Sequence, residues 1–255
     1  MMDIILYNIF VPICCLLIGY LFGSVPTALW VGKIFFHQDI TQYGSHNPGG
    51  TNAGRLWGKK VGFGIILFDM FKSVVPMWIC WAILTFVPMH NGSPLIASAK
   101  EFYTSANVDY VVQWPAYWLA ALGCMIGNCY SVFAKFKGGK GVSVFMGLIV
   151  FSSWLLGFIP GLFYFLFLKL TKTVSLTSIL TSILASLFSW VWTILILCKI
   201  IPTDLTWLPM YGPTLTCGYV YSSVVTLMSI IVIFRHKENI QRLKRGEERK
   251  ITWMK

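Results

Sequence analysis

Acidic residues are scarce in this chain, with 9 Asp and Glu against 20 Lys and Arg, and charged residues of either sign make up only 11% of its 255 positions. Hydrophobic residues make up 56%, and the mean hydropathy is +0.71. Several uncharged apolar runs approach or exceed about 20 residues, the length of an α-helix that spans a bilayer. This composition predicts an integral membrane protein that crosses the bilayer several times.

Several kinds of site are missing as well. The sequence has no Cys-x-x-Cys pair and no Cys/His ligand set, and its 7 cysteines lie mostly inside apolar runs, which predicts membrane-core cysteines rather than a metal centre. It also has no Ser-His-Asp or paired-carboxylate constellation. The positive charges lie between and after apolar runs, where the positive-inside rule places them, so the net charge of +11 does not predict a nucleic acid partner.

The apolar runs predict seven membrane-spanning helices in an all-α, polytopic integral membrane protein. Single helices are expected in 4–31, 61–87, 111–129, 175–197 and 217–234. The run 142–168 differs, because Gly157 and the Pro160-Gly161 pair interrupt it near its middle and Lys169 follows it directly. Keeping Lys169 on the same side as the lysines before the run requires an even number of crossings, so we expect two short helices there.

The cationic residues set the predicted orientation. With these spans, 17 of the 20 Lys and Arg fall on one side, in 33–60, 135–140, 169–172 and 235–255. This places the N-terminus outside and the C-terminus in the cytoplasm. We expect a single domain, 1–255, whose functional loops lie on the cytoplasmic side, at 35–60, 131–141, 169–175 and 235–255.

A glycine-rich, doubly cationic turn occupies Phe136-Lys137-Gly138-Gly139-Lys140-Gly141. Glycines permit positive φ and bring backbone N–H groups close to an anion, and a helix starting at Val142 would aim its N-terminus at the same point. The two lysines add full charges. The turn therefore predicts a phosphate-binding site; the alternative is a cytoplasmic turn whose lysines only set the topology.

A second polar stretch, 43–55, is rich in glycine and in hydrogen-bonding side chains. Its candidate ligand-binding residues are Ser45, Asn47, Gly49, Thr51, Asn52 and Arg55. Arg55 offers a planar fork of donors that matches phosphate oxygens. An ordinary connector would need far fewer such residues, so we interpret this stretch as a ligand-binding loop, with a plain surface loop as the alternative.

Further polar groups fall on the same predicted face. Ser24 stands near Pro26, which frees a backbone carbonyl near the inner end of the first helix, and Ser175 lies at the start of another helix. His236 and Asn239 are one helical turn apart. Two separate anion sites at one membrane face predict either one large polyanion or two phosphorylated substrates brought together.

A transporter for a phosphorylated anion is the main competing class, since broken helices and a cationic mouth would serve it equally well. Only Asp69 and Lys72 lie deeper in a span, so a path through the membrane is poorly marked. Their i to i+3 spacing puts them on one helix face. We interpret them as an ion pair that fixes helix packing, and a functional role is the alternative.

Seven motifs follow one another along the chain: Ser24-Val25-Pro26, Gly44-Ser45-x-Asn47-x-Gly49-x-Thr51-Asn52-x-x-Arg55, Gly58-Lys59-Lys60-x-Gly62, Asp69-x-x-Lys72, Phe136-Lys137-Gly138-Gly139-Lys140-Gly141-Val142, Val174-Ser175-Leu176 and Arg235-His236-x-Glu238-Asn239-Ile240-x-Arg242-Leu243. In this order they resemble the motifs of the bacterial acyl-phosphate:glycerol-3-phosphate acyltransferase family, PlsY. The resemblance implies acyl transfer from acyl phosphate to glycerol 3-phosphate, giving 1-acylglycerol 3-phosphate (lysophosphatidic acid) and phosphate, the first acylation step of phospholipid synthesis.

The resemblance also implies roles for single residues. Phosphate would be bound by Arg55, Lys140 and the loop residues Ser45, Asn47, Gly49, Thr51 and Asn52. The acyl phosphate would face Gly138, Gly139 and Gly141. Glycerol 3-phosphate would be held by Ser24, Ser175, His236 and Asn239. Ser24, Arg55, Lys140, His236 and Asn239 form the expected catalytic set. The family's reaction needs no metal, cofactor or covalent acyl-enzyme, and we expect a monomer among the lipids of a bacterial plasma membrane, with its active site on the cytoplasmic side.

The chain departs from the family pattern at a few positions. Asn128 stands where the family usually has His before the cationic turn, so a role for that histidine is in doubt here. His46 and Gly50 stand where the family favours Gly and Ala. The predicted outer loop 88–110 shows no obvious chemistry.

Overall fold

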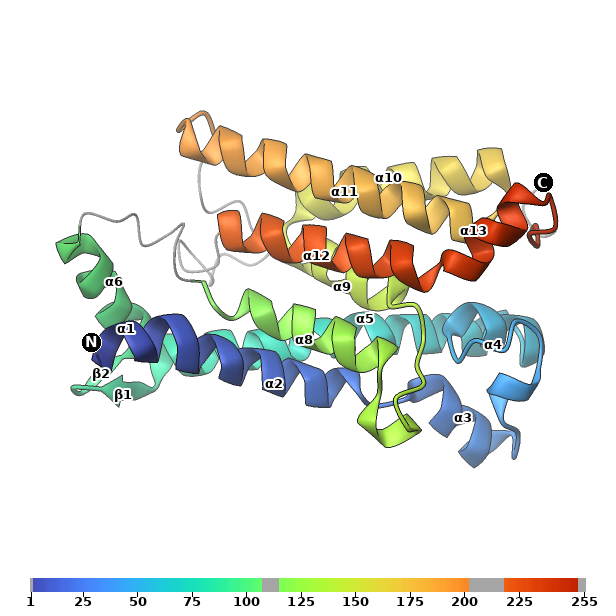
Figure 1. Ribbon diagram of the computed structural model, residues 1–255, viewed down its shortest axis with the longest axis horizontal. Helices are drawn as coiled ribbons and strands as arrows, with labels where there is room; N and C mark the ends of the chain where they lie inside the picture. The colour runs from blue at the N-terminus through green and yellow to red at the C-terminus, as the bar shows by residue number, and fades with distance from the viewer. Residues whose placement is uncertain (1, 107–114, 202–217, 252–255) are drawn as a thin grey trace.

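The computed structural model describes residues 2–106, 115–201 and 218–251, which form a bundle of α-helices (Figure 1). The N-terminal part consists of α1 (Met2–Ile5), a π-helical turn η1 (Leu6–Phe10), α2 (Val11–Gly23), α3 (Thr27–Phe35), the 3-10 turn η2 (Ile40–Gln42), α4 (Gly50–Leu56) and α5 (Lys59–Phe86). A short antiparallel pair, β1 (Pro88–His90) and β2 (Ser93–Pro94), and α6 (Leu95–Ser105) follow. The rest comprises α8 (Trp118–Cys129), the 3-10 turn η3 (Val132–Ala134), α9 (Val142–Ser152), α10 (Trp154–Thr171), α11 (Val174–Leu197), α12 (Tyr219–Arg235) and α13 (Lys237–Lys244).

The long helices lie roughly along the long axis of the molecule (Figure 1). One end carries the N-terminus, the β1-β2 pair and α6, and the other carries α3, α4, α13 and the C-terminus. Within the described residues, four helical segments are long and apolar enough to cross a membrane, namely Met2–Phe35, Lys59–Phe86, Trp154–Thr171 and Val174–Leu197, and the bent pair α12 and α13 adds a fifth.

The helical, polytopic membrane architecture expected from the sequence is therefore confirmed. The helices Trp118–Ala134 and Val142–Ser152 are apolar but shorter. The number seven and the orientation of the termini stay predictions, and the expected starts of two spans, 111–114 and 217, lie outside the described residues. The two ends of the chain do lie at opposite ends of the bundle (Figure 1), as an odd number of crossings requires.

The run 142–168 forms two helices, as predicted, but only α9 is short, because α10 has 18 residues and continues to Thr171. The break also lies before Gly157 and the Pro160-Gly161 pair, which the sequence had suggested as its position. The chain turns at Ser153, which is extended (φ −154°, ψ 139°), and Pro160 lies inside α10. Gly157 serves packing instead of turning: a Cβ there would lie 2.8 Å from Cα of Val150 on α9. With 11 residues, α9 is only about 16 Å long and cannot cross a bilayer by itself.

Helices α2 and α8 pack in very close contact through glycines spaced four residues apart on each. A Cβ on Gly19 would lie 1.8 Å from the Ala120 carbonyl oxygen, and one on Gly123 would lie 2.0 Å from that of Leu16. Gly23 and Gly127 repeat the pattern one turn further along. Such small-residue stripes let membrane helices approach backbone to backbone. The pairing fixes the end of α8 beside the break that follows α2.

The outer surface and the interior of the bundle differ in polarity. Large apolar side chains are exposed along α2 and α10, as on lipid-facing helices: Ile13, Leu17, Leu21, Phe158, Leu162 and Phe165. Inside, α11 and α12 are joined by buried hydroxyl groups, including Thr193 with Ser222 at 2.8 Å and Ser182 with Ser229 at 3.2 Å. Hydrogen bonds of this kind hold helices together where hydrophobic burial provides no driving force.

Candidate active site

The break between α2 and α3 is held by a buried ion pair. Lys72 Nζ lies 2.9 Å from Asp69 Oδ1, and it also donates to the Val25 carbonyl and to Asn128 Oδ1, each at 2.9 Å. Thr27 Oγ1 donates to Asp69 Oδ1 at 2.8 Å. The Val25 carbonyl, whose residue precedes the helix-breaking proline, is thus satisfied by Lys72. The predicted ion pair is confirmed, and its assignment to helix packing stays an interpretation, because Asp69 also lines the pocket described below.

The cationic turn 136–141 is fastened to the end of α8 and to α12. The Gly139 N–H donates to the Asn128 carbonyl at 3.0 Å. Arg235 donates from Nη2 to the Gly138 carbonyl at 2.9 Å and from Nε to the Gly139 carbonyl at 3.1 Å. Its guanidinium carbon lies 5.2 Å from the centre of the Tyr130 ring. Arg235 therefore binds the carbonyl groups of the turn, whereas the sequence placed it in a motif without assigning it a role.

The glycines of this turn serve two different purposes. Gly141 has a left-handed backbone (φ 74°), and α9 starts directly after it, so the helix N-terminus lies next to Lys140. Gly138 is not left-handed; a Cβ there would lie 2.2 Å from the Asn128 carbonyl oxygen. Of the three glycines in the turn, only Gly141 has a positive φ, and Lys135 (φ 51°) and Phe136 (φ 58°) just before them are also left-handed.

Lys140 is half-buried and donates a hydrogen bond to Asn239 Oδ1. Burial lowers the pKa of Lys140 to about 8, and the charges of Arg242 and Arg235 lower it further while Glu248 and Glu238 oppose the shift. The ammonium is still mostly charged at neutral pH. A partly desolvated cation interacts more strongly with an anion than an exposed one.

His236 is 3% exposed, and its Nδ1 lies 2.7 Å from the Val232 carbonyl oxygen. A carbonyl only accepts, so Nδ1 carries the proton. Burial lowers the pKa of His236 to about 4, and the charges of Lys140 and Arg235 also lower it, against the Val232 carbonyl and Glu248. The ring is therefore neutral at physiological pH, and its Nε2 is a hydrogen-bond acceptor.

Glu248, in the segment after α13, connects three of the surrounding side chains. Its Oε1 accepts from Ser175 Oγ at 2.8 Å and from Asn239 Nδ2 at 2.6 Å, and its Oε2 accepts from Arg242 Nε at 2.8 Å. Burial alone would raise the pKa of Glu248, but these hydrogen bonds and the charge of Arg242 hold it below the ordinary value. Sequence reasoning missed Glu248, and the only signal was an acidic residue inside a strongly basic tail.

The loop 43–55 is braced from within by Asn52, which is 2% exposed. Its Oδ1 accepts from the Ser45 N–H at 3.0 Å, and its Nδ2 donates to the carbonyls of Ile40 at 3.3 Å and Tyr43 at 3.0 Å. The carboxamide of Asn52 is thus used to shape the loop. Ser45 itself is exposed on the loop surface.

The remaining predicted loop residues lie around the start of α4. The Gly49 N–H donates to the Asn47 carbonyl at 2.9 Å, so Gly49 is not a free donor. Asn47 is half-buried, and Thr51 is exposed in the first turn of the helix. Arg55 is exposed in the last turn of α4; partial desolvation of its guanidinium and the charge of Arg249 lower its pKa, opposed by Glu248.

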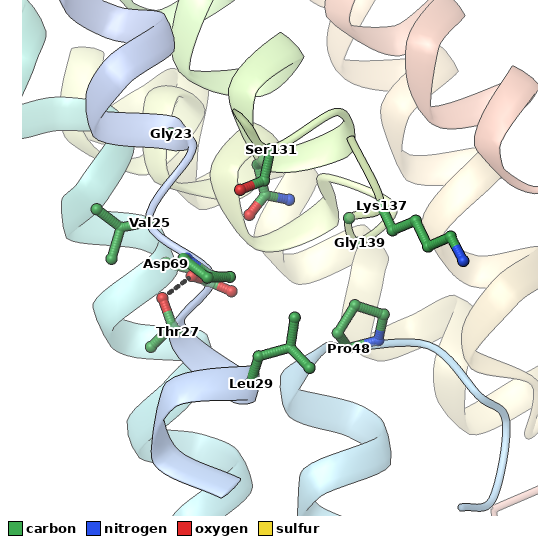
Figure 2. Close-up of a pocket in the computed structure, with 12 residues that line it drawn as sticks. Gly23, Val25, Thr27, Leu29, Pro48, Asp69, Ser131, Lys137 and Gly139 are labelled. Carbon is green, nitrogen blue, oxygen red and sulfur yellow. Dashed lines mark hydrogen bonds between the residues drawn. The ribbon is translucent and has the colours of Figure 1, made fainter. Parts of the chain in front are cut away.

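A small pocket lies where the α2-α3 break, the 43–55 loop and the cationic turn meet (Figure 2). Figure 2 shows the hydrogen-bonded Thr27 and Asp69 on one side, and Ser131 and Gly139 on the other. Ser24 is fully buried next to it; its carbonyl accepts from Ser131 Oγ, while its own hydroxyl has no partner among the described residues.

The structure therefore separates the predicted residues into two groups. Lys140, Ser175, His236 and Asn239 come together around Glu248, and Arg55 lies within electrostatic reach of that carboxylate. Ser24 and the pocket lie by the α2-α3 break, on the side of the turn where Gly138 and Gly139 meet Asn128. Cations and hydrogen-bonding groups thus flank the cationic turn, an arrangement suited to two phosphorylated ligands.

The family model described as glycerol-3-phosphate acyltransferase matches residues 13–246. Two glycerol-3-phosphate acyltransferases of Staphylococcus aureus, from strains bovine RF122 / ET3-1 and JH9, are each 32% identical over 246 residues, covering 95% of this chain and 98% of the relative.

Two crystal structures of PlsY (YgiH), an integral membrane glycerol 3-phosphate acyltransferase, have a similar fold. The glycerol 3-phosphate form superposes with a TM-score of 0.67 at 25% identity and covers 94% of this chain and 96% of that one. The lysophosphatidic acid form superposes with a TM-score of 0.66 at 24% identity, covering 94% and 95%.

Proposed function

This chain belongs to the glycerol-3-phosphate acyltransferase family, and from that premise we propose that it transfers an acyl group from an acyl phosphate to glycerol 3-phosphate. The products are 1-acylglycerol 3-phosphate and inorganic phosphate. The observation that carries the proposal is the gathering of Lys140, His236 and Asn239, together with Ser175, beside the cationic turn.

The chemistry of the proposed donor matches what the site contains. In an acyl phosphate the carbonyl carbon already bears a good leaving group. The glycerol hydroxyl oxygen forms a bond to that carbon, the carbon–oxygen bond to phosphate breaks, and the hydroxyl proton passes to a phosphate oxygen. This needs orientation of two anions and stabilisation of developing charge rather than a protein nucleophile. Cations and hydrogen-bonding groups are what surrounds the turn.

We assign the phosphate groups to the cationic side chains. The ammonium group of Lys140 is partly desolvated. Arg55 lies close enough to Glu248 for the carboxylate charge to affect the pKa of its guanidinium. The 43–55 loop contributes Ser45, Asn47, Gly49 and Thr51. The side chain of Asn52 holds this loop in its conformation through three hydrogen bonds. Gly138, Gly139 and Gly141 would face the acyl phosphate.

The glycerol part of the acceptor is assigned to His236, Asn239 and Ser175. A neutral imidazole with its proton on Nδ1 offers Nε2 to a hydroxyl group, which donates. That contact orients the attacking oxygen without requiring the histidine to be charged. We place Ser24 at the inner wall of the site, where its hydroxyl, which has no partner in the part of the chain that the structure describes, can donate or accept a hydrogen bond.

The membrane setting supports entry of the acyl chain from lipid. Phe133 and Phe136 are 57% and 64% exposed on the segment that leads into the cationic turn. Aromatic side chains beside lysines are typical of the membrane interface. We propose that the turn lies at the cytoplasmic face of a bacterial plasma membrane, with lipids around a functional monomer of one domain, 1–255, and with active-site loops 35–60, 131–141, 169–175 and 235–255.

A comparison of donors tests the proposal. Purified protein in detergent is given labelled glycerol 3-phosphate with acyl phosphate, acyl-coenzyme A or acyl-carrier protein in turn. Labelled lysophosphatidic acid is expected with acyl phosphate and no metal or cofactor added. Transfer from acyl-coenzyme A or acyl-carrier protein but not from acyl phosphate would reject the proposed donor.

A further inference from the structure

Glu248 lies at the centre of the groups assigned to the glycerol part of the substrate. One oxygen of its carboxylate accepts from both Ser175 Oγ, at 2.8 Å, and Asn239 Nδ2, at 2.6 Å. The other oxygen accepts from Arg242 Nε at 2.8 Å. A carboxylate that accepts hydrogen bonds from two groups assigned to the substrate determines whether those groups can donate to a ligand or accept from it.

The hydrogen bond to Glu248 decides whether the Ser175 hydroxyl can donate to a ligand or accept from it. A serine hydroxyl has one proton and two lone pairs. Its proton is directed to Glu248, so the remaining capacity of Ser175 is to accept. In the same way, donation from Asn239 Nδ2 to Glu248 orients the carboxamide so that Oδ1 faces Lys140. That oxygen retains a second lone pair.

His236, like Ser175 and the Oδ1 atom of Asn239, can only accept a hydrogen bond from a ligand. Its Nδ1 proton is used by the Val232 carbonyl, which leaves Nε2 as an acceptor one helical turn before Asn239. Three acceptors in one cluster suit hydroxyl groups, which donate. They suit a phosphate dianion poorly, because its oxygens only accept and carry negative charge.

The segment that carries Glu248 is anchored on both sides. The Glu247 N–H donates to the Arg242 carbonyl at 2.9 Å, and the Ile251 N–H donates to the Lys172 carbonyl at 2.7 Å. Ile251 is 7% exposed. These contacts hold the carboxylate in the site as a fixed part of it, unlike a loose tail that a ligand displaces.

We propose that Glu248 is a positioning residue that presents Ser175 and Asn239 as hydrogen-bond acceptors for the glycerol hydroxyls of glycerol 3-phosphate. This rests on the proposed function and adds a source of acceptor specificity to it. The enzyme then distinguishes glycerol 3-phosphate from a phosphorylated alcohol without the middle hydroxyl, and the discrimination depends on Glu248 although Glu248 contacts neither substrate.

The test compares two acceptors in two variants. Glycerol 3-phosphate is compared with 3-hydroxypropyl phosphate, which keeps the phosphate and the reacting hydroxyl but lacks the middle one. The variants are Glu248→Gln, which is nearly isosteric but can donate to Ser175 and Asn239, and Glu247→Gln, the exposed neighbour, as the matched control. Both equilibrium binding and kcat/KM are measured for wild type and variants.

Wild type is expected to favour glycerol 3-phosphate, and Glu248→Gln is expected to reduce that preference by about tenfold, the effect of roughly one hydrogen bond. Glu247→Gln keeps the wild-type preference. Inorganic phosphate is expected to bind Glu248→Gln more tightly than wild type, because a neighbouring negative charge is gone.

Two results would overturn the proposal. An unchanged preference between the two acceptors in Glu248→Gln means that the carboxylate has only a structural role. Tighter binding of both acceptors, with the preference intact, means that Glu248 competes with substrate. Because binding is measured as well as turnover, a wild-type protein that binds both acceptors but transfers no acyl group contradicts the proposed function and still gives the preference on which this inference depends.

Discussion

Lys72 Nζ and Asn128 Oδ1 are joined by a hydrogen bond of 2.9 Å that ties the membrane-spanning helix α5 to the end of α8. Since an ammonium only donates, the oxygen of the carboxamide must face Lys72 and its Nδ2 must face the other way, where a Cβ on Gly139 would lie 3.4 Å from it. Asn128 thereby links the buried Asp69–Lys72 pair to the cationic turn without being charged itself.

Replacing one member of the ion pair leaves the other charge buried. Asp69→Asn is expected to lower the free energy of unfolding by about 3 kcal/mol, since the Lys72 ammonium loses its counter-charge in the bundle. The double variant Asp69→Asn with Lys72→Met is expected to recover most of that loss. Unfolding in detergent, followed by circular dichroism, measures it. Equal stability of the single variant and wild type would contradict this account of the pair.

The α2-α8 contact predicts a large effect from a single methyl group. Gly123→Ala is expected to lower the midpoint of thermal unfolding strongly, because its Cβ meets the rigid backbone of Leu16 at 2.0 Å. The matched control is Gly161→Ala in α10, where a Cβ meets nothing within 4 Å, and where alanine is expected to have little effect or to stabilise the helix. Similar midpoints for both variants would exclude the close approach of the two helices.

Lys140 predicts the alkaline limb of the pH profile. Its pKa of about 8 means that the charged form dominates below that pH, so turnover should decline as pH rises through about 8. Lys140→Arg keeps a charge at every pH measured and is expected to remove that decline, at a lower maximal rate because the geometry differs. The decline is measured from the pH dependence of kcat/KM for glycerol 3-phosphate in both proteins. An unchanged alkaline limb in Lys140→Arg would assign the limb to another group.

The neutral ring of His236 predicts that the pH profile of kcat/KM has no inflection from a histidine. Its pKa of about 4 lies below the ordinary histidine value of 6.5, so the ring is neutral across the physiological range, and kcat/KM should show no His236 titration between pH 5 and 8. His236→Ala is expected to lower kcat/KM about a hundredfold, through loss of the acceptor at Nε2. A titration near 6.5 that disappears in His236→Ala would contradict a buried, neutral ring.

His236 also affects stability with a defined sign. Because its folded-state pKa is depressed, the unfolded chain binds the extra proton first as pH falls below 6.5, so the folded state loses stability between about pH 6.5 and 4. His236→Ala is expected to weaken that part of the acid dependence. Thermal unfolding of both proteins at pH 7 and pH 5 checks it, and an identical loss in both would show that other groups cause the acid dependence.

The sequence was most informative where one local rule decides the structure. Length and hydropathy predicted a helical membrane protein of several spans, and Pro26 marks the break between α2 and α3. The hairpin in 142–168 followed from the charge of Lys169, but Pro160 and Gly157 misled the placement of its turn. A proline is tolerated inside a membrane helix, and a glycine is equally suited to close packing as to a bend.

Contacts between distant parts of the chain were not predictable in the same way. Glu248 accepts from Ser175, 73 positions away, and no periodicity or motif in the tail marks it. The partners of Arg235 on the turn are 96 and 97 positions away. Asn52 reads as a ligand-binding residue in the sequence, and only the folded loop shows its carboxamide turned inward.

The central claim, acyl transfer from acyl phosphate at the Lys140 site, is tested most directly by product stoichiometry. Purified wild type, Lys140→Ala and the exposed control Lys135→Ala are given acyl phosphate and glycerol 3-phosphate in detergent. Wild type and Lys135→Ala should form one phosphate and one lysophosphatidic acid per acyl phosphate consumed, and Lys140→Ala should form neither above background. Normal turnover by Lys140→Ala, or glycerol 3-phosphate uptake into liposomes by a wild-type protein that makes no lysophosphatidic acid, would contradict the account.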